Sequence, residues 1–405
     1  MSSFLIILLF ASKLFYVNIF AVGDFNFTLS DMCLVICLWQ LWFTKQRSLQ
    51  RDSGVLLGLR SMVVMALVAA LLNCISTIVM GTQIIGSIMN LIKRWLSLLI
   101  IPSYIYRCVT LPQRKKIIAW IMVIVVLYTI INFKNITSSE SERFTADGTA
   151  NPNVVAGLFG VLLIHLIHSE YKRPVKIGLT VLSCLMILAC SSRGGILAVA
   201  MGFTYWLWTN KNLIVEQKVR IVVGVVLLVA MCLPVGNWLF PAATQRIIDS
   251  FTGGLRNTTS YQMRMTTFWD MIEVMLSDVQ LLFFGTGFGN GNLQLEMARH
   301  YLFMTTADNM FGNLFGWCGL LGLPWLVMYF RHLWNMGKMV ERAGFPALFL
   351  LTMYMVALGF SQDAMFEPTV GCLYFIFTGL ELIQYADGSI KQQEETIVRK
   401  ESVLT

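Results

Sequence analysis

The sequence predicts an all-α integral membrane protein whose helices cross the bilayer about twelve times. Of its 405 residues, 57% are hydrophobic and 13% are charged, whereas soluble domains average about 45–50% and about 25%, respectively. Apolar runs of about 17–25 residues, the length that a helix needs to cross the hydrocarbon core, recur from one end of the chain to the other. This composition favours a polytopic membrane protein over a soluble class.

The expected spans are the successive apolar runs, each ended by flanking polar residues. The first run lacks a basic segment before it and a small-residue cleavage site, so we expect it to be retained. No internal repeat is visible, and the two halves of the chain do not resemble each other. We expect a single membrane domain over 1–405, with a large periplasmic loop at 237–307 and a cytoplasmic tail at 387–405. The expected spans cover residues 4–22, 26–43, 61–80, 84–106, 117–133, 152–169, 175–190, 194–209, 219–236, 308–330, 346–365 and 368–386.

Basic residues set the expected orientation, because Lys and Arg accumulate in cytoplasmic loops. When both termini are placed inside, the inner loops and the tail hold most of the 30 Lys and Arg residues. The formal net charge of +8 then follows from topology and does not indicate nucleic-acid binding. The 9 cysteines are scattered, nearly all in expected spans, without a disulfide framework or a zinc spacing. Neither a metal nor a cofactor is therefore expected.

The large outer loop contains a segment, residues 260–282, with apolar residues at helical spacing. We expect an amphipathic helix capped by Ser260, which lies along the membrane surface or covers a cavity. The expected apolar stripe comprises Met265, Phe268, Trp269, Ile272, Met275, Leu276, Val279 and Leu282, and the opposite side comprises Asp270, Glu273, Ser277 and Gln280.

Four cations stand where a charge is costly unless it has a partner. Arg264 is expected in the first turn of the amphipathic helix, where free backbone N–H groups add positive potential. It either binds an anion or reaches toward lipid headgroups. Arg193 occupies the tip of a short outer hairpin, "SSRGG", and faces either a cavity or water. Lys93 and Arg94 are adjacent within an apolar run, so they either serve a partner inside the membrane or mark a span shifted in register.

An acid and an amide, Asp308 and Asn309, open the late apolar run. Several cations and one carboxylate that face the outer leaflet suit a phosphorylated lipid, since the guanidinium fork of Arg can bind two phosphate oxygens. Transfer from a lipid diphosphate needs cations to neutralise the leaving group and a base beside the attacking hydroxyl. Asp308 is the candidate base, with Asn309 assisting, because partial desolvation raises the proton affinity of a carboxylate. His300, earlier in the same loop, is the alternative base.

Four stretches, in this order along the chain, resemble the motifs of one family. They are "NPNVVAGLFG" (151–160), "SSRGGILAV" (191–199), "RMTTFWDMIEVMLSDVQLLFFGTGFGN" (264–290) and "DNMFGNLFGWCGLLGL" (308–323). The second resembles a Ser-Arg-Gly turn, and the third an Arg-led helix followed by Gly-x-Gly. The fourth resembles an acid-or-His, Asn and Gly-x-x-Gly-Leu opening of a late span. Together they resemble the O-antigen ligase and polymerase superfamily, whereas the first part of the chain is similar only in hydropathy.

The resemblance implies a GT-C-like, metal-independent, inverting glycosyltransferase that uses undecaprenyl-diphosphate-linked glycans at the outer face of the bacterial inner membrane. It implies that Arg193 and Arg264 engage the donor diphosphate, and we expect Lys93 or Arg94 to help. Ligases carry a His before the Asn of the late motif, whereas this chain has Asp308. That difference favours the polymerase (Wzy-type) branch. Two roles for Asp308 remain open: it is either the base or a group that orients a sugar or an Arg.

The expected function is polymerisation of lipid-linked polysaccharide repeat units. The growing glycan would pass from undecaprenyl diphosphate to the non-reducing end of the next undecaprenyl-diphosphate-linked repeat unit, with the active site facing the periplasm. The expected partners are this lipid-linked oligosaccharide, membrane lipids and, by resemblance, a chain-length regulator. One alternative is an O-antigen ligase that transfers the glycan to lipid A-core. Another is a lipid-linked oligosaccharide flippase or other transporter, which would favour repeats and midplane polar residues in both halves.

Overall fold

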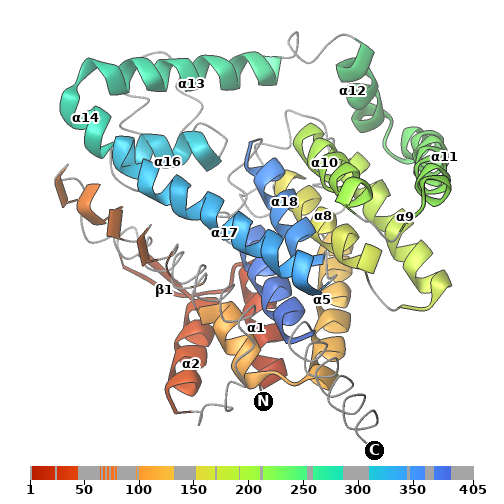
Figure 1. Cartoon of the computed structure of the whole chain (residues 1–405), viewed down its shortest axis with the longest axis horizontal. Helices are drawn as coiled ribbons and strands as arrows, with labels where there is room; N and C mark the ends of the chain where they lie inside the picture. The colour runs from red at the N-terminus through yellow and green to blue at the C-terminus, as the bar shows by residue number, and fades with distance from the viewer. Residues whose placement is uncertain are drawn as a thin grey trace, which may run out of the picture.

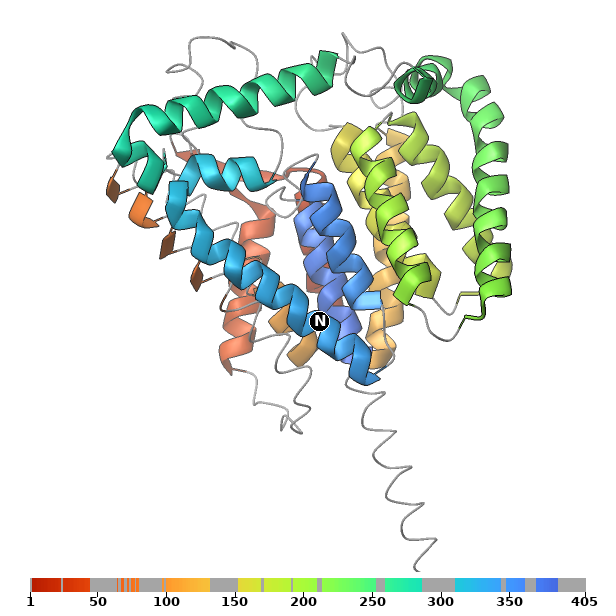
Figure 2. The same ribbon diagram turned by 45° about the horizontal axis from the view of Figure 1, so that its top comes forward.

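Helices make up nearly all of the structure, and one short β-hairpin interrupts them near the N-terminus (Figures 1 and 2). The predicted helical class is therefore confirmed for the residues that the structure describes, with the hairpin as an exception. The computed structural model describes residues 2–22, 25–43, 100–131, 152–168, 171–190, 192–209, 213–252, 259–285, 310–343, 347–360 and 369–384, together with scattered helical positions between 64 and 97.

The N-terminal apolar region forms a helix, a hairpin and a second helix. The elements are α1 (Ser2–Leu14), β1 (Asn18–Val22), β2 (Phe25–Thr28) and α2 (Leu29–Phe43). The predicted span at 4–22 is wrong in its second part, because β1 pairs antiparallel with β2. The rings of Phe20 and Phe27 stack across the pair with their centroids 4.9 Å apart. Hydrophobicity alone does not separate a short strand from a helix, and the β-branched and aromatic residues here favour the strand.

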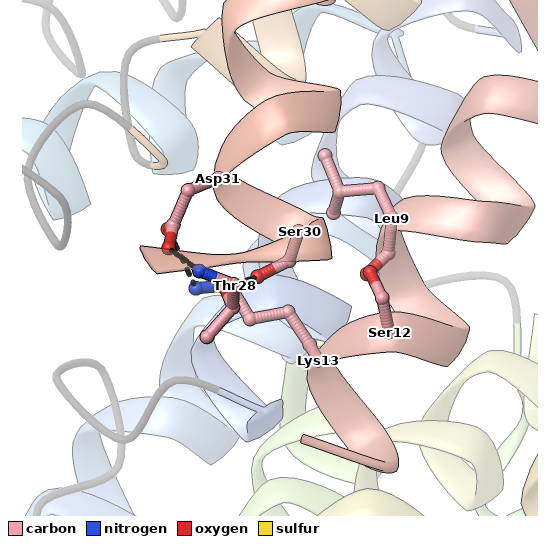
Figure 3. A network of polar contacts seen from close by, with 6 residues as sticks. All are labelled: Leu9, Ser12, Lys13, Thr28, Ser30 and Asp31. Atoms are coloured by element: carbon pink, nitrogen blue, oxygen red, sulfur yellow. Dashed lines mark hydrogen bonds and ion pairs between the residues drawn. The ribbon is translucent and has the colours of Figure 1, made fainter. Parts of the chain in front are cut away.

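Lys13, a cation inside the first predicted span, has a carboxylate partner at the start of α2 (Figure 3). Its Nζ lies 3.9 Å from Oδ1 of Asp31, and both side chains are largely buried. Oδ2 of Asp31 accepts hydrogen bonds from the backbone N–H and from the hydroxyl of Thr28, each at 2.7 Å. Thr28 directly precedes the helix, so Asp31 satisfies a free backbone donor at the N-terminus of α2. The hairpin thus brings the start of α2 back to α1, where the carboxylate of Asp31 compensates the charge of Lys13.

Most later helices lie close to the predicted apolar runs. Pro152 and Pro174 stand in the first turns of α8 and α9, where a missing N–H costs nothing because that position has no intrahelical acceptor. The largest differences are an earlier start of α5, an extension of α11 at both ends, and an earlier end of α18, which stops at Gly359 whereas the predicted span runs to residue 365. The helices are α5 (Leu111–Ile131), α8 (Pro152–His168), α9 (Arg173–Ala189), α10 (Arg193–Thr209), α11 (Val215–Leu239), α18 (Ala347–Gly359) and a final helix, Thr369–Gln384, which carries no label in Figure 1.

The core of the bundle lies among α8, α10, α18 and the final helix, whose facing side chains are buried together. The hydroxyl of Tyr354 in α18 donates to the backbone carbonyl of Gly157 in α8 at 3.3 Å. The hydroxyl oxygens of Thr352 and Tyr374 lie 3.0 Å apart between α18 and the final helix. These buried hydroxyl groups therefore have hydrogen-bond partners within the protein, which replace the hydrogen bonds that they would make to water.

A second buried polar cluster joins α5, α8 and the final helix. Nη2 of Arg114 lies 3.0 Å from Oε1 of Glu381, and its Nε donates to the carbonyl of Leu380 at 3.2 Å. Nδ1 of His165 lies 3.3 Å from the same Oε1 atom, and its ring packs against Phe377 with the ring centroids 4.7 Å apart. The side chains of Glu381 and His165 are almost fully buried. The carboxylate therefore depends on these partners for the stabilisation that water would otherwise provide.

Replacing Glu381 with Gln is expected to lower the free energy of unfolding by about 3 kcal/mol, because the largely buried guanidinium of Arg114 then lacks a counter-charge. Thermal unfolding of the purified protein measures this loss. Glu216→Gln is the matched control, since Glu216 pairs with Arg220 one turn along α11 and both side chains are mostly exposed. Its expected loss is below about 0.5 kcal/mol. Equal losses in the two variants would contradict a stabilising role for the buried pair.

Within the part of the chain that the structure describes, two helical segments are long and apolar enough to cross a membrane, Val215–Leu239 and Met310–His332. The second is largely buried inside the molecule, whereas α11 lies at the edge of the bundle (Figure 2). Most of its apolar side chains are exposed, including Met231 at 70% and Trp238 at 82%. A long helix with so much exposed apolar surface marks a site of contact with a membrane or with another protein.

Candidate functional site

One end of the bundle is covered by α12 (Pro241–Thr252), α13 (Thr259–Ser277) and α14 (Val279–Phe284), and we call it the roofed end (Figures 1 and 2). The helices α8 and α10 begin there: a Cβ at Gly195, near the start of α10, would lie 3.3 Å from the Cβ of Ala156, near the start of α8. α16 (Met310–Cys318) also begins there, because Met310 packs against Gly359, at which α18 ends. Three helix N-termini therefore share the roofed end.

Arg193 stands at the roofed end as the first residue of α10, at the turn where the sequence placed it. Ser192 is buried and caps this helix, since the backbone N–H of Gly195 donates to its Oγ at 3.3 Å. Nε of Arg193 is shielded from solvent, although the residue as a whole is partly exposed. The N-terminus of a helix carries about half a positive charge, to which the guanidinium adds a full one. Together they provide the charge and the N–H donors that an anion requires.

The predicted amphipathic helix is present as α13, and a short second helix, α14, follows it. Asp278 separates the two, because its side chain accepts the backbone N–H of Gln280 at 2.7 Å and so caps α14. Ser260 lies inside α13 and not before it, so its predicted role as the cap is wrong. Arg264 belongs to the second turn and not the first, and its side chain lies outside the described structure. By helical register, position 264 is on the same side of α13 as Met271.

The buried side of α13 is only partly the predicted apolar stripe. Met271 and Met275 are buried and pack against Phe315 of α16. Trp269 and Leu276 belong to the predicted stripe but are 59% and 65% exposed. The apolar residues of α13 are numerous enough to cover two sides of the helix, and periodicity alone does not show which side packs on the protein.

The predicted polar side of α13 is wrong at one residue, Asp270. The periodicity assigns it to the side away from the molecule, together with Glu273. In the structure Glu273 is exposed, whereas Oδ2 of Asp270 is buried. Asp270 therefore has one carboxylate oxygen shielded from solvent, although the periodicity assigns the residue to the outer side of α13.

The roof is held to the bundle by backbone contacts at its α14 end. The predicted span at 308–330 is interrupted by a 3-10 turn, Gly319–Leu321, between α16 and α17 (Gly322–Ala343). Gly285, which ends α14, and Gly319 have φ angles of +69° and +55°. A Cβ at Gly285 would lie 2.4 Å from the backbone carbon of Trp317. The buried hydroxyl of Ser76 reaches the carbonyl of Trp317 at 2.6 Å and also that of Phe284, so its proton serves the ends of both helices.

Several predicted site residues lie outside the described residues: Lys93, Arg94, His300, Asp308 and Asn309. In the sequence, Asp308 and Asn309 directly precede the start of α16 at the roofed end. The structure thus places the start of α10, the helix α13 that carries position 264, and the start of α16 at the same end of the bundle.

Two residues of the roofed end are not among the residues that the sequence singles out. Ser192 has a recognisable signal, because a Ser directly before Arg-Gly-Gly fits the start of a capped helix. Asp270 has no such signal, since its place in the helical pattern assigns it to the outer side.

The roofed end can bind a polyanion through Arg193 and the helix N-termini, and it can accept hydrogen bonds through the carboxylate of Asp270. This combination suits a ligand with a phosphate part and a hydroxyl-rich part. No protein-family model matches the sequence, and no curated protein matches it significantly.

Proposed function

We propose that this protein polymerises lipid-linked polysaccharide repeat units at the outer face of the bacterial inner membrane. The bond between the anomeric carbon of the growing glycan and undecaprenyl diphosphate breaks. A glycosidic bond forms to a hydroxyl at the non-reducing end of the next lipid-linked repeat unit, and the hydroxyl proton passes to a base. The observation that carries this proposal is Arg193 at the capped N-terminus of α10, at the roofed end of the bundle.

The exposed apolar surface supports a location in the membrane. Water solvates a long apolar helix such as α11 poorly, whereas a bilayer of about 30 Å matches its length. Exposed Trp side chains occur at Trp42, Trp208 and Trp334, in the later parts of α2, α10 and α17, and at Trp238 near the end of α11. In the proposed topology the first three lie near the cytoplasmic face and the fourth near the periplasmic face. Trp prefers both membrane–water interfaces, so these exposed Trp side chains support a location in the membrane, whereas the proposed orientation rests on the Lys and Arg residues of the inner loops.

In the proposed site, cationic side chains bind the diphosphate of the donor, and hydrogen-bonding side chains act on the acceptor hydroxyl. Arg193 and Arg264 hold the donor diphosphate, with Lys93 or Arg94 assisting, and their charges stabilise the leaving group as negative charge develops on it. Asp308 activates or aligns the acceptor hydroxyl with the help of Asn309, and His300 is the alternative base. The roof of α13 covers this chemistry, which limits the access of water as a competing acceptor.

Deletion of the gene in its host tests the proposed function, with surface glycolipids separated on a gel and probed for the repeat unit. We expect the ladder to collapse to lipid A-core that carries a single repeat unit, because joining to the core still works and only polymerisation is lost. Long lipid-linked chains without attachment to the core would identify a ligase. Repeat units confined to the cytoplasmic leaflet would identify a flippase. An unchanged ladder would refute all three functions.

A further inference from the structure

One carboxylate oxygen in the roof, Oδ2 of Asp270 in α13, finds no hydrogen-bond donor among the described residues. This oxygen is shielded from solvent, although the residue as a whole is partly exposed. Thr266, one turn earlier on α13, is a polar neighbour on the same side of the helix. Its hydroxyl donates instead to the carbonyl of Gln262 at 2.9 Å, so it does not serve Asp270.

Two other carboxylates give the comparison, and in Asp31 the Oδ1 atom is also buried without a hydrogen bond but lies 3.9 Å from Nζ of Lys13. Asp31 accepts two hydrogen bonds from Thr28, and Asp278 accepts one from the backbone of Gln280. Buried polar atoms in native proteins nearly always have a partner, because removing an unpaired acceptor from water is unfavourable. An oxygen held in this way is poised to accept a hydrogen bond from a group outside the described protein structure.

The position of Asp270 indicates which part of a ligand it would meet. Its neighbour Met271 packs against Phe315 of α16, so this part of α13 lies over the helix that begins at the roofed end. A negative carboxylate repels a diphosphate, whereas the guanidinium of Arg193 attracts it. A carboxylate instead accepts hydrogen bonds from sugar hydroxyls, and its two oxygens can serve two of them.

We infer that Asp270 is a sugar-binding residue, which accepts a hydrogen bond from a hydroxyl of the lipid-linked glycan beneath the roof. The inference rests on the proposed function and assigns the two parts of the substrate to different residues. Arg193 binds the diphosphate end of the substrate, and Asp270 binds its carbohydrate. The donor for the buried oxygen is then the substrate itself.

The test compares Asp270→Asn with Glu273→Gln, a matched change at an exposed carboxylate of the same helix. The probe is the undecaprenyl-diphosphate-linked repeat unit isolated from the deletion strain, and undecaprenyl diphosphate without sugar is the reference. Asp270→Asn is expected to raise the KM for the repeat unit about tenfold, because a neutral amide is a weaker acceptor than a carboxylate. It is also expected to lose the thermal stabilisation that the sugar-bearing lipid gives, and to keep that of the sugar-free lipid. Glu273→Gln is expected to behave as wild type in both measurements.

A purely structural carboxylate predicts the opposite result. Asp270→Asn would then stabilise the unliganded protein, because it removes a poorly solvated charge, and the KM would not change. That outcome overturns the inference, and if the wild-type protein makes polymer it leaves the proposed function intact. If the wild-type protein makes no polymer but the sugar-bearing lipid stabilises it through Asp270, the proposed reaction fails and the sugar-binding role stands. If neither polymer nor stabilisation is seen, both fail.

Discussion

The Gly319→Ala variant is expected to lose about 4 kcal/mol or more of its free energy of unfolding. At a φ of +55°, an Ala residue costs about 1–2 kcal/mol more than Gly. Its Cβ would also lie 2.4 Å from the carbonyl oxygen of Leu282 and 2.8 Å from the backbone nitrogen of Gly285. These are backbone atoms, which cannot rotate away as a side chain can, so α14 and the turn after α16 must separate. Thermal unfolding of the purified protein in detergent measures the loss.

Gly224→Ala is the control for this variant, and its expected effect has the opposite sign. Gly224 lies inside α11, and a Cβ there would meet nothing within 4 Å. Ala has the higher helix propensity, so the free energy of unfolding should rise by about 0.5–1 kcal/mol. A Gly319→Ala protein as stable as wild type would show that α14 and the turn at Gly319 are not in backbone contact.

The contact at Gly319 matters for the site as well as for stability. α13 lies over α16 through Met271, Met275 and Phe315, and α14 fixes the end of α13 to the break in the late helix. The roof is therefore attached at the element that follows Asp308 in the sequence. A loss of this attachment would loosen the packing of α13, the helix that carries Asp270, on α16.

The sequence predicts the fold well where local chemistry decides it. The starts of α8 and α9 follow from Pro152 and Pro174 and from the polar residues around them. The strand at 18–22 was not predicted, because an apolar run has the same hydropathy in a strand as in a helix. The break at Gly319 was not predicted either, since its positive φ depends on contacts with the distant residues of α14.

The same distinction applies to the candidate site. The turn that carries Arg193 was predicted from the local pattern of Ser, Arg and Gly, and the structure places it at the start of α10. The partners of Arg114 and Lys13 were not predicted, because Glu381 is far away in the sequence and Asp31 is brought close only by the hairpin. Helical periodicity identifies the faces of a helix but not which face meets the protein.

The Arg193→Ala variant is expected to reduce the rate of polymer formation by about two to three orders of magnitude, because the diphosphate loses a charge that stabilises it as a leaving group. Arg193→Lys is expected to fall between this variant and wild type, since an ammonium keeps the charge but cannot bind two phosphate oxygens in a fork. The length of the glycan ladder in cells and the rate of transfer in isolated membranes measure both effects. Thermal unfolding of each variant shows whether α10 is intact, since Arg193 is its first residue.

Arg173→Ala is the matched control for the loss of an arginine at the start of a helix. Arg173 is the first residue of α9, is exposed, and lies at the end of the bundle opposite the roof. Its removal lowers the net charge by the same amount but takes no cation from the roofed end (Figure 1), so polymer formation should stay at the wild-type rate. Equal losses in the two alanine variants would indicate a general effect of charge. A folded Arg193→Ala protein that makes full-length polymer at the wild-type rate would remove Arg193 from the site. The proposed diphosphate contact would then have to come from Arg264 or from the cations of the apolar run at 84–106.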